Sequence, residues 1–232
     1  MPTIDSHVHL GPWDIDYFYG LKSTIQMLES TYKDYYGLLV IPTDRYENEI
    51  TKRILDKTSL NTKFAAWGTP DNFDEICNME FDAIKLHPAL SRTPVINDSY
   101  TDLISLAEVR EVPVIIHCGG ILETDYHYVL NRAKEYPQVK FVINHLGGRS
   151  YQKQWNCPID SLRYRNVYID TTMRIMYWTI EHAQSVVGSG RMLFGSDYPL
   201  IKPEVGVQAI MTSNVNHEDI LFNTAHKLFW EE

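Results

Sequence analysis

The stretch "VPVIIHCGGILETDYHYVLNRAKEYPQVKFVINHLGG", residues 112–148, decides the fold class. It contains two short apolar runs, "VII" and "FVI", and a segment of helical spacing lies between them at residues 124–137. Short runs of this kind suit strands that are covered on both faces, and a helical crossover joins strands that run parallel. We therefore expect a strand–helix–strand unit whose two strands each end near a histidine.

The same alternation continues in both directions along the chain. Another segment of helical spacing lies at residues 99–111, and the chain closes on a further one at 217–232. Eight strand-like runs match a (β/α)8 TIM barrel, whereas a Rossmann or flavodoxin-like sheet would use five or six strands, and no G-x-G-x-x-G follows an early run. We predict an α/β fold, a minimal (β/α)8 barrel, as a single domain over residues 1–232. The expected strands are 3–10, 36–43, 64–70, 82–88, 112–120, 140–148, 166–172 and 191–199.

Composition excludes several classes of function. The chain has 21 Lys and Arg against 30 Asp and Glu, a net charge of −9, and its basic residues form no cluster, so we expect no nucleic-acid partner. No apolar run approaches the roughly 18 residues of a membrane span, and the first residues resemble no secretion signal, so we expect a cytoplasmic protein. Cys77, Cys118 and Cys157 lack C-x-x-C spacing, which predicts reduced thiols.

Polar residues lie where the expected strands end, which is where barrels carry catalytic groups. In "TIDSHVHL" the alternation of strand side chains puts Asp5, His7 and His9 on one face and Ile4 and Val8 on the other. If that first face is the barrel interior, the two imidazoles converge above the barrel axis. Asp5 is then either a partner of these histidines or a polar residue at the floor.

Four other expected strands bring further groups to the same rim. Lys85 and His87 share a face of the fourth strand, while His117 and His145 end the fifth and sixth, on the faces of Ile115 and Ile143. Asp197 ends the eighth strand. Imidazoles and a carboxylate that converge at one rim suit Zn²⁺ or a similar divalent ion, with three or four protein ligands and one position left for water. The competing interpretation is a purely structural cluster of histidines.

The ordered motifs D-x-H-x-H, "VIIHCGG", "VINHLGG" and "LFGSDYP" resemble the amidohydrolase superfamily of metal-dependent hydrolases. The resemblance is to the amidohydrolase-related branch that includes aminocarboxymuconate-semialdehyde decarboxylase, and it spans nearly the whole chain. It implies a barrel, and we expect a minimal one without the superfamily's extra β-sandwich domain, because too few residues precede the first strand to build one. It also implies a metal held by His7, His9, His117 and Asp197, with His145 beside it to polarise the substrate or orient water.

The resemblance leaves the number of metal ions open. In binuclear members a lysine of the fourth strand becomes a carbamate that bridges two metals, and Lys85 has the right strand and face for that role. The alternative, which we favour, is an ammonium that binds a substrate carboxylate or pairs with an acid. His87 has no firm family role: it could support a ligand, contact the substrate or be a satisfied core histidine, and we favour the last.

Loops after the strands set the substrate. The first of them, residues 11–20, is aromatic, with Trp13, Tyr17, Phe18 and Tyr19, so it could form a wall over the site. Arg149 and Arg174 each follow a strand closely, where a guanidinium could bind a substrate carboxylate. We therefore expect a small, carboxylated molecule as the substrate; a homo-oligomer is possible.

Metal-activated water makes hydrolysis of an amide, ester or lactone the leading hypothesis, with Asp197 as ligand and proton carrier. A decarboxylase of the same branch is the alternative. A phosphoesterase or nuclease is disfavoured by the acidic charge and by the lack of a mid-barrel glutamate. A barrel that binds metal without catalysis is the non-enzymatic alternative.

Overall fold

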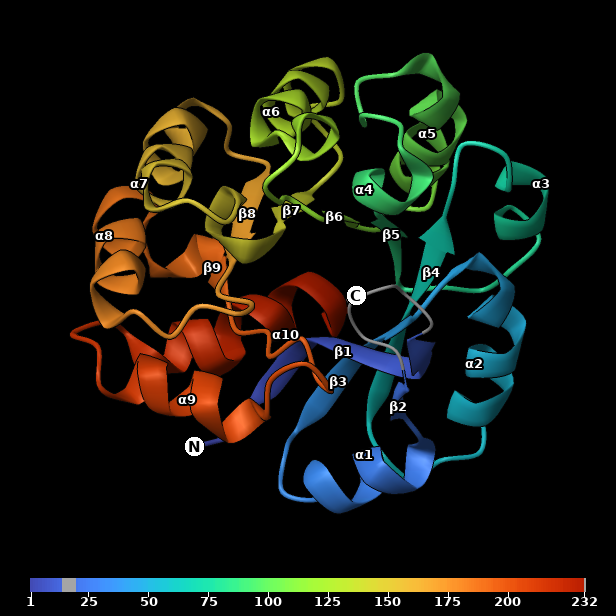
Figure 1. Ribbon diagram of the computed structural model, residues 1–232, viewed down its shortest axis with the longest axis horizontal. Helices are drawn as coiled ribbons and strands as arrows, with labels where there is room; N and C mark the ends of the chain where they lie inside the picture. Colours follow the sequence, from blue (N-terminus) through green and yellow to red (C-terminus); the bar gives the residue numbers. More distant parts are fainter. Residues whose placement is uncertain (14–19, 232) are drawn as a thin grey trace.

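The computed structural model describes residues 1–13 and 20–231, apart from the side chain of residue 46. Within these residues the strands form one sheet in the order β2-β1-β3-β4-β5-β6-β7-β8-β9 (Figure 1). Neighbours from β1 and β3 through to β9 are parallel, and β2 pairs antiparallel with β1. The strands are β1 Ile4–Trp13, β2 Leu21–Ser23, β3 Gly37–Pro42, β4 Thr62–Gly68, β5 Ala83–Leu86, β6 Val114–Ile116, β7 Phe141–Ile143, β8 Val167–Asp170 and β9 Met192–Leu193.

The sheet closes on itself between β1 and the segment that follows β9. Backbone bonds run from Ser6 N–H to the carbonyl of Phe194 (2.9 Å) and from Asp197 N–H to that of His7 (2.9 Å). His9 N–H donates to the carbonyl of Tyr198 (2.8 Å), beside a parallel bridge between Tyr198 and Val8. The parallel strands therefore form a closed barrel, which confirms the predicted fold class.

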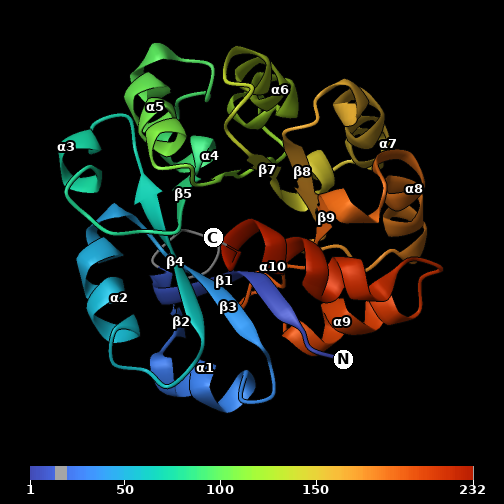
Figure 2. The same cartoon turned by 180° about the vertical axis from the view of Figure 1, so that it is seen from behind.

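Helices cover this barrel: most surround it on the outside, and the last in the chain lies across one end, as the two opposite views show (Figures 1 and 2). They are α1 Ile25–Thr31, α2 Asn48–Leu55, α3 Phe73–Ile76, α4 Pro88–Ser91, α5 Thr101–Val109, α6 Tyr126–Glu135, α7 Tyr151–Asp160, α8 Tyr177–Val187, α9 Pro203–Met211 and α10 Thr224–Phe229. Short 3-10 turns occur at Arg45–Glu47, Asp98–Tyr100, Leu122–Thr124, Asn144–Gly147, Ser161–Arg163 and Ser189–Arg191, and a π-helical turn at Asp219–Asn223. The expected helices at 99–111 and 124–137 correspond to α5 and α6.

Apolar side chains separate into an inner and an outer core, as alternation along strands requires. The outer core packs the sheet against the helices. The inner core fills the barrel, and α10 closes it at the end where the strands begin, because Trp230 beyond α10 donates to Asn61 just before β4. The polar groups are thus left to the opposite end. The inner core consists of Ile4, Leu39, Ile41, Ala65, Trp67, Ala83, Ile115, Val142 and Leu193, with Ala225, Leu228 and Phe229 from α10.

Strand β1 contains a bulge that corrects the expected arrangement of its side chains. Asp5 pairs with Leu38 of β3 but Val8 pairs with Val40, so three steps along β1 match two along β3. As a result Ile4 packs in the inner core and Asp5 faces outward, where the Tyr32 hydroxyl donates to it (2.9 Å). The prediction that Asp5 shares a face with His7 and His9 was wrong, because a bulge reverses the alternation.

Two other features of the fold bear on where chemistry can occur. No helix of the described residues is long and apolar enough to cross a membrane.

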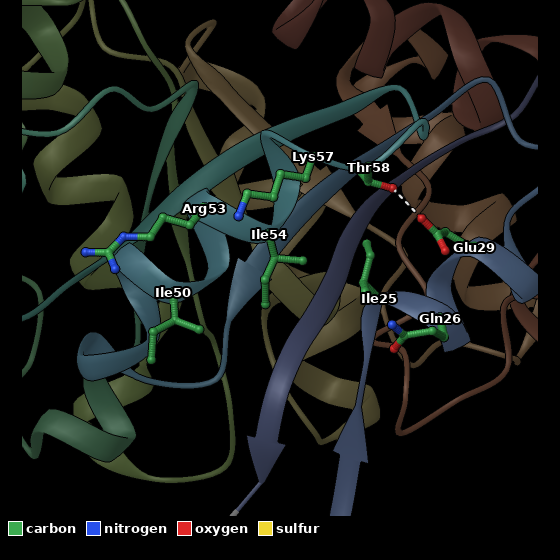
Figure 3. Close-up of a pocket in the computed structure, with 8 residues that line it drawn as sticks. All are labelled: Ile25, Gln26, Glu29, Ile50, Arg53, Ile54, Lys57 and Thr58. Carbon is green, nitrogen blue, oxygen red and sulfur yellow. Dashed lines mark hydrogen bonds between the residues drawn. The ribbon is translucent and has the colours of Figure 1, made fainter.

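A groove of about 390 Å³ lies on the outer surface between α1 and α2 (Figure 3). Its walls hold no histidine or cysteine, and it lies outside the barrel, so it is separate from the candidate site. Its lining residues are Ile25, Gln26, Glu29, Ile50, Arg53, Ile54, Lys57 and Thr58.

Candidate metal centre

Strand β1 and the segment after β9 bring His7, His9 and Asp197 together at the mouth of the barrel. Asp197 Oδ1 lies 3.4 Å from Nε2 of His7 and 3.2 Å from Nε2 of His9. All three residues are buried, and a ligand atom of each lies within 4.8 Å of the other two. Among the described residues this is the group suited to a metal ion, and we call it the metal group.

The two imidazoles of the metal group are both fixed at Nδ1. His7 Nδ1 lies 3.2 Å from Asp170 Oδ2, and His9 Nδ1 lies 3.2 Å from the carbonyl oxygen of Pro42. Because these oxygens can only accept, each ring carries its hydrogen on Nδ1 and directs Nε2 at Asp197. Only a proton or a metal cation can lie between these Nε2 atoms and Asp197 Oδ1. The donor set of two nitrogens and one carboxylate oxygen fits a divalent ion such as Zn²⁺.

Electrostatics in the metal group favour the ligand forms of its side chains. Burial lowers the pKa of His7 to about 4, and the charge of Lys85 adds to that effect. Burial alone would raise the pKa of Asp197, but the bond with His9 and the charges of His7 and His145 hold it well below its usual range. At neutral pH His7 is therefore neutral and Asp197 ionised, which are the states that ligate metals.

The backbone around Asp197 adopts a left-handed conformation and approaches His7 closely, and both features bring Asp197 to the metal group. Asp197 has φ of 68°, in the left-handed region that non-glycine residues seldom occupy. A Cβ at Gly195 would lie 2.7 Å from the Cβ of His7 and 2.7 Å from Thr172 Oγ1, so only glycine allows this close approach. The motif "FGSD" therefore lets the closing segment press against β1 and turn its aspartate inward.

Asp170, at the end of β8, is a central residue of the site that the sequence analysis missed. Besides His7, its carboxylate accepts from the backbone N–H of His145 (2.7 Å) and of Thr172 (3.2 Å). Burial would raise its pKa, but the bond and charge of His7 and the charge of His145 hold that pKa below its ordinary value. The sequence did contain a signal for its inward direction. Val167 and Ile169 pack in the outer core, so the alternation of strand side chains points Asp170 into the barrel.

Lys85 lies inside the barrel on the predicted face of β5, together with Ala83. Its Nζ donates to Oδ1 of Asn144, and the amide of Asn144 donates to Asp170 Oδ2 (2.7 Å). Burial lowers the pKa of Lys85 to about 8, against the raising effect of the charges of Asp170 and Asp197. Asn144 was also missed, although it follows the alternation of Val142.

His145 reaches the site by a different route from the expected one. Ile143 packs in the outer core, so the predicted inward face was wrong, and the alternation instead points Asn144 inward. His145 and Leu146 have φ of 60° and 50°, and this left-handed turn brings the His145 ring back over the barrel mouth. Its ring centroid lies 5.9 Å from that of His7.

Three other imidazoles contact one another beside the metal group, and we call His87, His117 and His145 the stacked histidines. The ring of His117 stacks on that of His87 at 4.0 Å and meets that of His145 edge-on at 4.8 Å, and His87 also stacks on Trp67. Nδ1 of His117 lies 3.0 Å from Nε2 of His145. Burial lowers the pKa of all three rings, most strongly at His87 and His117, and the like charges of neighbouring histidines contribute at those two.

Hydrogen positions on the stacked histidines follow from their partners. Nδ1 of His145 faces the carbonyl oxygen of Thr172 at 3.4 Å and so carries the hydrogen. In a neutral ring Nε2 of His145 then accepts from Nδ1 of His117, and Nε2 of His117 keeps its lone pair. His117 is not among the residues whose ligand atoms converge with those of His7 and Asp197, so it lies outside the metal group in this structure. Its Nε2 nevertheless has the form that a metal ligand needs.

The predicted substrate contacts lie around this rim. Arg174 is half-buried, and its Nε has no hydrogen-bond partner among the residues described. Burial lowers its pKa, as does the charge of Arg149, whereas the charges of Asp170 and Asp197 raise it, so the two guanidiniums and the carboxylates share one region. Trp13 packs against His9, with 4.7 Å between ring centroids. The rest of the predicted aromatic wall, at 14–19, falls outside the described residues.

Comparisons with known proteins bear on this site. A sequence model of a family described as "Amidohydrolase" matches residues 63–229, which include Lys85, His117, His145 and Asp197. A search of curated proteins gave no significant match. The match covers more than half of the chain, and the chain therefore belongs to this amidohydrolase family.

Solved structures of the same fold cover nearly the whole chain. An amidohydrolase 2 from Bifidobacterium longum subsp. infantis has a TM-score of 0.78 at 18% identity, covering 100% of both chains. A 2-pyrone-4,6-dicarboxylic acid hydrolase, so described provisionally, from Pseudomonas putida has a TM-score of 0.77 at 15% identity, covering 99% of this chain and 97% of its own. The 5-carboxyvanillate decarboxylase from Sphingomonas paucimobilis has a TM-score of 0.76 at 11% identity, covering 100% and 99%. At such identities the likeness concerns the fold.

Proposed function

We propose that this member of the amidohydrolase family is a hydrolase that depends on one divalent metal ion, Zn²⁺ by preference. Its substrate is a small carboxylated molecule with an amide, ester or lactone bond. The observation that carries the proposal is the convergence of two Nε2 atoms and a carboxylate oxygen, with Nδ1 of each ring already occupied. Three protein ligands with an open position are typical of catalytic zinc sites.

A divalent ion bound there would supply Lewis acidity and lower the pKa of water toward about 7. Asp197 is ionised at neutral pH, so its carboxylate can accept the proton of the attacking water and return it to the leaving group. His117 is the proposed fourth ligand, because Nε2 of its ring keeps a lone pair. His145 is proposed to orient the attacking water, whose O–H can donate to Nε2 of that ring in exchange for its bond with His117.

One ion fits the surroundings of Lys85 better than two. A bridging carbamate would have to form at Nζ, but that atom is buried and already donates to Asn144. We therefore assign Lys85 an ammonium group that is linked to Asp170 through an amide. This role also places Lys85 away from direct contact with a substrate.

Two cations at the rim support a carboxylated substrate. Arg174 has an Nε without a partner among the described residues, and Arg149 lies close enough to affect the pKa of Arg174. A guanidinium binds a carboxylate through two parallel hydrogen bonds, so one carboxylate could be held at this rim. Trp13, whose ring packs against that of His9, would contact the apolar part of the substrate.

The same two arginines favour a decarboxylase as the second candidate. A carboxylate held near the ion is the group that a decarboxylase removes, and the 5-carboxyvanillate decarboxylase shares the fold. In that reaction the carbon–carbon bond breaks to release CO₂, and a proton must replace the lost group.

The cytoplasmic location and a homo-oligomeric state stay predictions from the sequence.

A panel of carboxylated amides, esters and lactones tests the proposal on Zn²⁺-loaded protein. We expect release of acid together with amine or alcohol, and loss of that release after chelation and in Asp197→Asn. Asp56→Asn is the matched control, because Asp56 is exposed at the end of α2 and pairs with Lys52. Release of CO₂ alone would replace the hydrolase with the decarboxylase, and turnover that survives chelation would contradict both.

A further inference from the structure

We infer that Lys85, Asn144 and Asp170 form a positioning chain that fixes the ring of His7, so that Nε2 of His7 faces the metal. This inference rests on the proposed function, which makes His7 a ligand. None of the three residues belongs to the metal group, and their effect on the ion would pass through His7. They are therefore positioning residues rather than catalytic ones.

The contacts run in one line from the barrel interior to the ligand. Lys85 Nζ donates to Asn144 Oδ1, Asn144 Nδ2 donates to Asp170 Oδ2 (2.7 Å), and that same oxygen lies 3.2 Å from His7 Nδ1. Each of the three residues is at most 1% exposed. Water therefore cannot replace these bonds, and a break in the line would leave a buried polar group unpaired.

Charge gives the line its direction. An ammonium can only donate and a carboxylate can only accept, so the amide of Asn144 must present oxygen to Lys85 and nitrogen to Asp170. The negative end of the line then meets His7, where it accepts the hydrogen of Nδ1. The opposite tautomer of His7 would place a lone pair against a carboxylate oxygen, which is unfavourable in a buried site.

The other oxygen of Asp170 extends the same control to a second histidine. Oδ1 accepts from the backbone N–H of His145 (2.7 Å), where the chain adopts φ of 60°. One carboxylate thus orients the ring of His7 and stabilises the left-handed turn that carries His145. The positioning chain therefore links the metal group to the stacked histidines.

Asp5 provides a matched control, because it is another buried carboxylate bonded to His7. Its Oδ1 accepts from the backbone N–H of His7 (3.2 Å) and from that of Ser196 (2.9 Å), while its Oδ2 accepts from Tyr32. Asp5 faces the outer core and touches the backbone of His7 rather than its ring. A variant at Asp5 therefore tests whether any buried carboxylate beside His7 has the same effect.

The experiment measures two properties of Asp170→Asn and Asp5→Asn. The first is the tautomer of His7, from ¹⁵N shifts of the imidazole rings in metal-free protein, with the His7 signal assigned by its absence in His7→Gln. The second is the Zn²⁺ dissociation constant, from competition with a chromophoric chelator. In Asp170→Asn we expect His7 to move its hydrogen to Nε2, because an amide nitrogen would face Nδ1, and Zn²⁺ to bind about 10–100-fold more weakly.

Asp5→Asn should leave the tautomer unchanged and the affinity within about twofold. Lys85→Met keeps Asp170 but removes the start of the line, and it should change both measurements in the same direction as Asp170→Asn. Lys85→Met can also be measured in place of Asp170→Asn if the latter does not fold. A wild-type His7 tautomer and a wild-type Zn²⁺ affinity in folded Asp170→Asn or in folded Lys85→Met would overturn the inference. Because the tautomer is read without metal, a wild-type protein that binds no Zn²⁺ would contradict the proposed function and still leave the positioning chain tested.

Discussion

The metal group and the stacked histidines lie side by side at one barrel mouth, yet they differ in what surrounds their rings. In the metal group, carboxylate and carbonyl oxygens fix Nδ1 of both imidazoles and Asp197 faces both Nε2 atoms. Among the stacked histidines the rings contact one another instead, with the His117–His145 bond between two neutral imidazoles. The comparison teaches that acceptor oxygens, more than the number of imidazoles, prepare a site for a cation.

The largest expected effect comes from removing the carboxylate that the metal group shares. Asp197→Asn keeps the shape but removes the negative charge, so bound Zn²⁺ should fall to background in elemental analysis. Turnover should fall by a factor on the order of 10³ or more, because both metal activation of water and the proton carrier are lost. Stoichiometric Zn²⁺ in this variant would show that the oxygen of Asp197 is not needed to hold the ion.

His117 tests the boundary between the two groups. We expect His117→Ala to weaken Zn²⁺ binding about 10–100-fold, and by less than His9→Ala, because His117 lies outside the metal group and its ring must first move toward the ion. The measurement is the same chelator competition for both variants. A loss as large as that of His9→Ala would make His117 a full member of the metal group, and no loss would remove it from the ligand set.

Acid should destabilise the metal-free protein because its imidazoles are buried in the neutral form. The folded pKa of His7 is about 4, and those of His87 and His117 lie well below 6.5, so between pH 6.5 and 5 the unfolded chain binds more protons than the folded one. Stability is therefore lost as pH falls, by about 2 kcal/mol for a fully buried ring such as His7. Thermal unfolding at pH 7 and pH 5 should show a Tm at least about 5 °C lower at pH 5.

Asp5 sharpens this pH test because its contribution to stability changes with pH in the opposite direction to that of the histidines. Burial raises the pKa of Asp5 to about 7, so between about pH 4 and 7 the folded state holds the extra proton and gains stability as pH falls. Asp5→Asn removes this gain, and its Tm should therefore fall more steeply between pH 7 and 5 than that of the wild type. A Tm that is constant or rises toward pH 5 in Asp5→Asn would show that the imidazoles are not buried in the neutral form.

The smallest expected effects concern the substrate. Arg174→Gln should raise KM for a carboxylated substrate about tenfold with kcat nearly unchanged, because its side chain is half-buried beside the metal group. Arg149→Gln should raise KM by less, since Arg149 is exposed. Steady-state kinetics with the acid and its methyl ester measure both effects. Equal KM values for acid and ester in the wild type would contradict a carboxylate contact at this rim.

Sequence patterns predicted the barrel because strand-to-helix alternation is a local property that eight units repeat. They also located the rim residues, since an ending strand can be read from Gly, Asp or His after an apolar run. The faces were harder to predict. The bulge before Val8 turns the side chain of Asp5 to the outer face, and the left-handed turn at His145 ends the alternation of side chains along β7. Both depend on tertiary contacts that no local sequence pattern contains.

Asp170 and Asn144 show a different kind of miss. Both alternate correctly with apolar neighbours, so their inward direction could have been predicted from the same rule that found Lys85 and His87. Their roles could not, because a bond such as Asn144 to Asp170 joins β7 to β8 and depends on the register between them. The pairing of His117 with His145 rather than with His7 is likewise set by the packing of rings.

The most direct test of the account is a crystal structure of the Zn²⁺-loaded protein with anomalous data collected at the zinc edge. We expect one peak about 2.0–2.2 Å from Nε2 of His7, Nε2 of His9 and a carboxylate oxygen of Asp197. We also expect no density for a carbamate on Lys85. A peak among His87, His117 and His145 alone, or no peak at saturating Zn²⁺, would contradict it.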